Sequence, residues 1–112
     1  MATKVSTIEY IEDQLVELPG VHSRKMFGEY ALYVGDKVVA LVCDDELFVK
    51  MTAEGREFVG EKCEERSAYP GAKASMWIDA DMIDDHAWLC ELIRITAEVL
   101  PEPKPKKKKR AD

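Results

Sequence analysis

Long hydrophobic runs are absent from the sequence. No stretch of its 112 residues approaches the roughly 18 consecutive apolar residues that a membrane-spanning helix requires. The N-terminus also lacks the basic and then apolar segments of a secretory signal peptide. Hydrophobic residues are nevertheless plentiful, at 46%, which is ordinary for a globular protein. We therefore expect a cytoplasmic protein with one domain, because this length supports a single core.

Cysteine and histidine are also scarce. The three cysteines, Cys43, Cys63 and Cys90, are widely spaced, and the two histidines, His22 and His86, lie far apart in the sequence. A structural zinc site takes about four such ligands, usually in closely spaced pairs. The sequence therefore predicts buried, reduced thiols and no metal site.

Four aspartates lie close together near the start of the last apolar segment: Asp79, Asp81, Asp84 and Asp85. Such a group suggests a divalent-metal site, but the ligand spacing and central glycine of an EF-hand loop are missing. We interpret the aspartates as helix caps and a solvated acidic turn, since helix N-termini favour negative charge. They predict no metal ligand.

The motif Met26-Phe27-Gly28 places a glycine directly before an alternating run. A phosphate-binding loop would need further glycines at fixed spacing, but the next glycine is Gly35, so neither the P-loop nor the dinucleotide template fits. We interpret Gly28 as a bend or bulge at the entry to a sheet. No Ser/His/Asp or Cys/His set has a supporting local motif. An enzyme is therefore the least favoured class, and we predict no catalytic residue and no cofactor.

Charge is divided unevenly along the chain. Residues 1–100 contain 10 Lys and Arg against 20 Asp and Glu, a net charge of −10, whereas residues 101–112 have a net charge of +4. Alternating prolines and mutually repelling lysines predict a disordered tail. Its candidate nucleic-acid-binding residues are Lys104, Lys106, Lys107, Lys108, Lys109 and Arg110. Nonspecific phosphate contact and a merely solubilising tail are equally weighted interpretations.

Apolar spacing predicts an amphipathic helix near the N-terminus. Its apolar residues recur every three or four positions, at Ile8, Ile11, Leu15 and Leu18. Ser6 and Glu9 have the spacing of a capping box, in which each side chain bonds a free backbone amide. The Pro-Gly pair at positions 19 and 20 ends the helix.

From His22 onward the apolar period changes to two, which predicts strands. Short polar turns separate them, so neighbouring strands should run antiparallel. After a first strand near His22, the predicted strands are 30–34, 38–43, 47–50 and 74–78. The second and third of these five strands are apolar on both faces, which indicates a central position in the sheet.

Two further helices complete the expected fold. Thr52 caps a short helix through about Gly60, and the last helix starts at Asp81 or Asp84 and ends before Pro101. The order α-β-β-β-β-α-β-α has no long parallel crossover, which favours the α+β class. We expect two layers, with an antiparallel four- to five-stranded sheet covered on one face by helices.

Taken together, these motifs resemble a known family. The stretch RKMFGEYALYVGDKVVALVCDDELFVKM, followed by YPGAK and a terminal apolar helix, is similar to the N-terminal domain of the TfoX/Sxy family, whose members are usually described as regulators of competence genes. The matching positions are Met26-Phe27-Gly28, Tyr30, Leu32, Tyr33, Gly35-Asp36, 47–50 and Tyr69-Pro70-Gly71-Ala72-Lys73. The resemblance implies a two-layer unit over residues 1–100, followed by the tail of residues 101–112, and it brings no enzymatic residues.

Three functional hypotheses remain open. The leading one is a small transcription- or competence-regulator-like protein that acts through contact with an unidentified protein partner, for which the transcription machinery is a candidate. Weak tail-mediated DNA contact accompanies this role. The second is a small-ligand binder or enzyme with a pocket near Met26, Tyr69 and Lys73. The third is a homodimeric scaffold that pairs through an exposed sheet edge. We interpret the motif residues mainly as structural: Met26, Phe27, Gly28, Tyr69, Pro70, Gly71 and Lys73.

Overall fold

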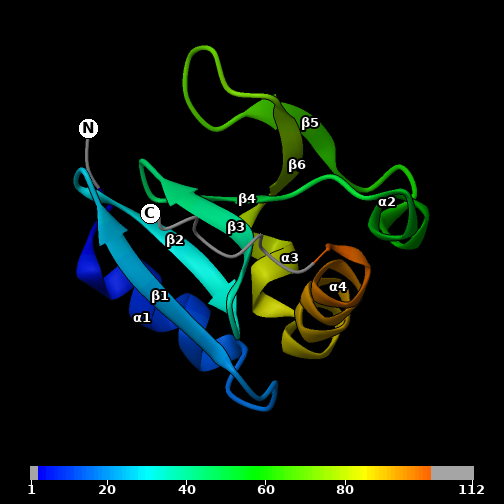
Figure 1. The fold of residues 1–112 in the computed structure, drawn as a ribbon, viewed down its shortest axis with the longest axis horizontal. Helices are drawn as coiled ribbons and strands as arrows, with labels where there is room; N and C mark the ends of the chain where they lie inside the picture. Colours follow the sequence, from blue (N-terminus) through cyan, green and yellow to red (C-terminus); the bar gives the residue numbers. More distant parts are fainter. Residues whose placement is uncertain (1–2, 102–112) are drawn as a thin grey trace, which may run out of the picture.

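The structure, a computed structural model, describes residues 3–101 (Figure 1). These residues form six strands and four helices. In chain order they are α1 (Val5–Gln14), β1 (Val21–Met26), β2 (Glu29–Val34), β3 (Lys37–Cys43), β4 (Glu46–Val49), α2 (Ala53–Val59), β5 (Glu64–Ser67), β6 (Ala74–Ile78), α3 (Ala80–Asp84) and α4 (His86–Val99). The basic residues of the tail lie outside the described residues.

The six strands form one antiparallel sheet in the order β1-β2-β3-β4-β6-β5. The predicted α+β class is confirmed, whereas the predicted number of strands is too low. The strand that the sequence did not reveal is β5. Its four residues, Glu64–Ser67, are all exposed and none is apolar, so no alternation marks it. It forms by pairing as an edge strand with β6.

Where the sequence predicted one last helix, the structure has two, α3 and α4, separated at Asp85. The Oδ1 atoms of Asp79 and Asp85 each accept a backbone N–H from the first turn of the helix that follows, at 2.9 and 3.2 Å. The interpretation of these two residues as caps is confirmed. The predicted helix start at Asp81 or Asp84 is wrong. Asp79 and Asp85 are the N-cap residues, and α3 and α4 each begin at the residue that follows.

The helices cover one face of the sheet, where the core lies (Figure 1). The register places Leu32, Ala40, Val49 and Met76 side by side across four strands, and all four are fully buried. The α4 residues in the same core cluster include Leu89, Leu92 and Ile93. Burying one large apolar side chain contributes about 1.5–3 kcal/mol. This layer therefore fixes which side chains face the helices.

The N-terminus of α1 is capped by a residue from a distant turn. Asp45, between β3 and β4, accepts the backbone N–H of Lys4 at 2.9 Å and the Thr7 hydroxyl at 2.8 Å, both through Oδ1. No residue of the helix itself supplies a side-chain cap, so the predicted capping box of Ser6 and Glu9 is wrong. Two hydrogen bonds lower the pKa of the Asp45 carboxyl. The one from the Lys4 amide has the larger effect, and the one from the Thr7 hydroxyl has the smaller effect.

Replacing Asp45 with asparagine should therefore lower the free energy of unfolding at neutral pH. Because the folded-state pKa is lowered, the ionised carboxylate stabilises the fold above its unfolded pKa of about 3.9, and that contribution is lost as the pH falls. Urea unfolding near pH 7 and near pH 3 measures the effect. The difference in the free energy of unfolding between wild type and Asp45→Asn should be clear near pH 7 and should shrink near pH 3. A difference of equal size at both pH values would contradict the stabilising role assigned to the ionised Asp45 carboxylate.

Candidate functional site

The face of the sheet opposite the helices carries a second row of apolar residues. Ala31, Leu41, Phe48 and Trp77 lie side by side across four strands, one position out of phase with the core row. Because side chains alternate along a strand, this row points to the other face. We call this side of the sheet the open face.

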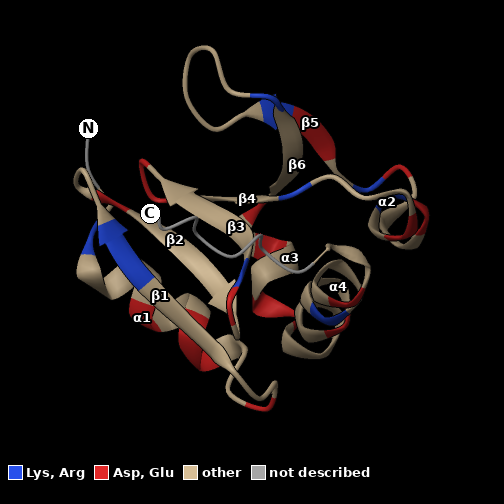
Figure 2. Ribbon diagram, viewed as in Figure 1, with Lys and Arg blue, Asp and Glu red and all other residues tan. Residues whose placement is uncertain are grey.

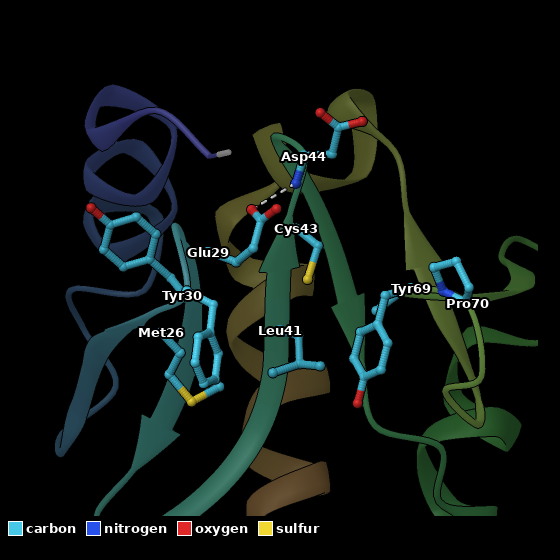
Figure 3. Close-up of a pocket in the computed structure, with 10 residues that line it drawn as sticks. Met26, Glu29, Tyr30, Leu41, Cys43, Asp44, Tyr69 and Pro70 are labelled. Carbon is cyan, nitrogen blue, oxygen red and sulfur yellow. Dashed lines mark hydrogen bonds between the residues drawn. The ribbon is translucent and has the colours of Figure 1, made fainter. Parts of the chain in front are cut away.

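A cavity of about 710 Å³ lies on the open face, and we call it the first cavity. Met26 at the end of β1 and Phe27 in the turn that follows form one wall. The loop between β5 and β6, with Tyr69 and Pro70, forms the other wall, and Leu41 lies between the two (Figure 3). The structure thus brings together residues of two motifs that are far apart in the sequence.

Phe27 occupies a backbone conformation that most residues avoid. With Gly28 it forms the two-residue turn of the β1–β2 hairpin, where φ is 52° at Phe27 and 82° at Gly28. A left-handed conformation costs a residue with a Cβ roughly 1–2 kcal/mol, and such turns usually take Asn-Gly. The Phe27 ring is fully exposed, so no burial offsets this cost. Where the sequence suggested a bend or bulge at Gly28, the structure has a tight hairpin turn.

Glu29 and Asp44 form the polar end of the first cavity. Glu29 Oε1 accepts the Thr3 hydroxyl at 2.6 Å and the Asp44 backbone N–H at 3.0 Å, the second of which is drawn in Figure 3. These bonds tie the N-terminal segment and the β3–β4 turn to β2. Tyr30 also borders the cavity, but its ring points away from Leu41 (Figure 3). The polar end of the cavity is therefore held in place by hydrogen bonds within the chain.

The thiol of Cys43 borders the first cavity without being activated. Burial, with a smaller effect of the Glu29 and Asp44 carboxylates, raises its pKa. Burial likewise raises the pKa of Cys63 and Cys90, and all three cysteines are free thiols. Since the thiolate is the reactive form, none of them is a good nucleophile near neutral pH.

A second cavity of about 400 Å³ adjoins the first and shares Tyr69 with it. Its polar side chains are those of Lys50, Tyr69, Lys73 and Ser75. Figure 3 shows the Tyr69 hydroxyl pointing away from Asp44. Lys73, the polar residue of the YPGAK motif, thus borders a hollow next to the one that its neighbours Tyr69 and Pro70 line.

Neither histidine borders either cavity. His22 Nε2 lies 2.8 Å from the carbonyl oxygen of Gly35, and its ring stacks on Tyr33 with the centroids 5.1 Å apart. His86 is the exposed first residue of α4. No imidazole is therefore placed to act as a general base at these cavities.

Residues 3–101 contain no group of three or more His, Cys, Asp or Glu side chains that could hold a metal ion. Within the same part of the chain, no helix has the length and apolar character needed to cross a membrane.

Several residues of the two cavities were not singled out from the sequence. They include Glu29, Leu41, Asp44, Ala68 and Ser75, and Cys43 and Lys50 were noted in the sequence but not as residues of a site. Each sits on or beside a strand, and which face it points to depends on the register with neighbouring strands. The only signal in the sequence was the alternation itself, which does not say which strands become neighbours.

The fold and the two cavities define a small α+β domain with an apolar hollow on the open face of an antiparallel sheet. Residues 13–100 match the family described as the TfoX N-terminal domain, and the chain belongs to that family. The resemblance seen in the sequence is thereby confirmed. An uncharacterized 12.7 kDa protein in the trpE 5′ region of Spirochaeta aurantia is 43% identical over 109 residues, which cover 97% of this chain and 93% of that protein.

Replacing Phe27 with asparagine should raise the free energy of unfolding by about 1 kcal/mol, because asparagine tolerates the left-handed turn and the lost ring buries nothing. Urea unfolding measures the change. Gly28→Ala provides the opposite control and should destabilise the hairpin, since its φ of 82° suits glycine. A clear loss of stability in Phe27→Asn would show that the ring packs against the protein in solution.

Proposed function

We propose that this chain is a cytoplasmic, non-catalytic interaction module of the transcription-regulator type, and that it holds an apolar segment of a partner protein in the first cavity. The observation that carries the proposal is Phe27, a fully exposed ring in a turn whose geometry disfavours it. A residue that costs stability and buries nothing in its own fold is best explained by contact with another molecule. The regulatory setting rests on the resemblance to regulators of competence genes.

The rim of the first cavity has the composition of a binding surface. Met26 and Tyr69 are 41% and 56% exposed, and they flank the cavity beside the fully exposed Phe27. Methionine and aromatic residues are enriched in protein interfaces, and contiguous exposed apolar side chains mark interaction sites. A partner side chain inserted between the β1–β2 turn and the β5–β6 loop would contact all three of these residues.

Charge indicates the chemistry of the partner segment. Residues 1–100 carry a net charge of −10, and Asp44 and Glu46 are exposed near the polar end of the first cavity. Opposite charges across an interface speed association and reject wrong partners. We infer that the bound segment has an apolar anchor flanked by lysine or arginine.

Phe27→Asn should abolish or weaken capture of the partner by roughly thirtyfold, the effect of removing an anchor worth about 2 kcal/mol. The measurement is quantitative affinity capture from a nuclease-treated lysate of the native host, using full-length wild type and variant. Because the substitution is expected to stabilise the fold, unfolding does not explain a loss.

The matched control is Val16→Ala, which removes another exposed apolar side chain, 75% exposed, that borders neither cavity. The proposal requires a protein that wild type and Val16→Ala capture equally and that Phe27→Asn loses. Equal capture by all three proteins would rule out the first cavity as the binding site.

The tail adds a weaker, electrostatic contact with DNA in this proposal. Its basic residues, 104 and 106–110, lie outside the described residues, and the contact rests on charge alone. Deleting residues 102–112 should lower the affinity for duplex DNA in fluorescence anisotropy and flatten its dependence on salt concentration. An unchanged affinity and salt slope would leave the tail with a solubilising role.

A homodimeric scaffold is the less favoured alternative, because both edges of the sheet are charged. β5 presents Glu64, Glu65 and Arg66, and β1 presents Arg24 and Lys25, all exposed. Charged edge strands oppose pairing between sheets.

A further inference from the structure

The polar side chains that line the second cavity carry only ammonium and hydroxyl groups. Its polar side chains are two lysines, Lys50 and Lys73, and the hydroxyls of Tyr69 and Ser75. No carboxylate lines it, although acidic residues outnumber basic ones twofold in residues 1–100. Figure 2 shows basic residues near the end of the β5–β6 hairpin and directly after β4, within a largely acidic domain. The chemistry of this hollow is therefore opposite to that of the domain as a whole.

The register explains why these groups meet. β4 pairs with β6 as far as Val49 and Met76. The next residues are Lys50, directly after β4, and Ser75, within β6. Both lie on the open face, two positions beyond Phe48 and Trp77 respectively. Lys73 lies two residues before Ser75, so alternation places it toward the same side. Lys50 directly follows β4 and Lys73 directly precedes β6, so the ends of the two strands bring both lysines to one hollow.

Both lysines are available to a ligand. Other cations are engaged: Arg56 pairs with Glu65 at 2.8 Å, and Arg66 pairs with Glu64 at 3.0 Å while lying over the Trp77 ring. Among the described residues, no ion pair or hydrogen bond engages the ammonium group of Lys50 or Lys73. Two positive charges that border one cavity and have no ion-pair partner attract an anion.

The floor of the second cavity is apolar. Leu41, Phe48 and Met51 are among the residues that line this cavity, and Tyr69 also lines it. A cavity of about 400 Å³ lies within the range of small-molecule sites, which are mostly apolar with a few placed polar groups. We propose that this cavity binds a small organic anion, with its carboxylate or phosphate between Lys50 and Lys73 and its apolar body against Tyr69 and Leu41. This site adjoins the partner surface and shares Leu41 and Tyr69 with it, but its two lysines line only the second cavity and Phe27 lines only the first.

The test is an NMR titration of the ¹⁵N-labelled full chain with benzoate, phenyl phosphate and the neutral analogue benzamide, and with inorganic phosphate as the anion alone. At least one of the two aromatic anions should give saturable shifts at residues of the second cavity, with a Kd about fivefold below that of benzamide. The tighter of the two identifies the head group. Inorganic phosphate should bind more weakly than the tighter anion, because it lacks the apolar body.

Variants assign the binding to the two lysines. Lys73→Gln and Lys50→Gln should each weaken binding of the tighter anion about fivefold, since each removes one charge from an exposed position. Lys25→Gln is the matched control, because Lys25 is exposed, pairs with Tyr30 in the register and borders neither cavity. It should leave the affinity unchanged.

Three results would overturn the proposal. The first is the absence of saturable shifts with either aromatic anion, and the second is benzamide binding as tightly as both anions do. The third is that Lys25→Gln weakens anion binding as much as Lys73→Gln does. Phe27→Asn should leave anion binding unchanged. The failure of this proposal and the failure of the partner-binding proposal are therefore distinguishable.

Discussion

Burial of one face of the sheet under the helices is the constraint on which the rest of the molecule depends. Once Leu32, Ala40, Val49 and Met76 are committed to the core, the two-residue period of a strand leaves no choice for their neighbours. Leu41 and the residues beside it must face the other way. The apolar open face is thus a direct result of how the core is packed, and both cavities are built on it.

Two sequence motifs owe their meeting to the strand order. Because β6 inserts between β4 and β5, the loop that carries Tyr69 and Pro70 returns over the sheet to the turn that carries Met26 and Phe27. The glycines and proline in these motifs shape turns, as their residue types indicate. The remaining side chains meet at one hollow, and this placement is hard to explain by turn geometry alone. Phe27 is the clearest case, since asparagine would suit its turn better.

Much of the fold was predictable because local signals agreed with the final packing. Apolar periodicity revealed α1 and the strands β2, β3 and β4. Residue type revealed the Thr52 cap, whose hydroxyl accepts the Gly55 N–H at 2.9 Å. The errors arose where a distant part of the chain decides the local structure. β5 exists only through its pairing with β6, and α1 is capped by Asp45 from another turn. The site was less predictable for the same reason: Lys50 and Lys73 become neighbours only through a register that no local pattern encodes.

The β4–β6 junction has a mechanical consequence. The sheet consists of a four-strand meander and a separate hairpin, and along the sheet these are joined by only three residue pairs: Leu47–Ile78, Phe48–Trp77 and Val49–Met76. Each cavity has one wall on the meander and the other on the hairpin or its loop. A small rotation about this seam would change the aperture of both hollows together, and it would also move Met76 within the core layer beneath α4. The same three residue pairs therefore set the spacing between the walls of both hollows.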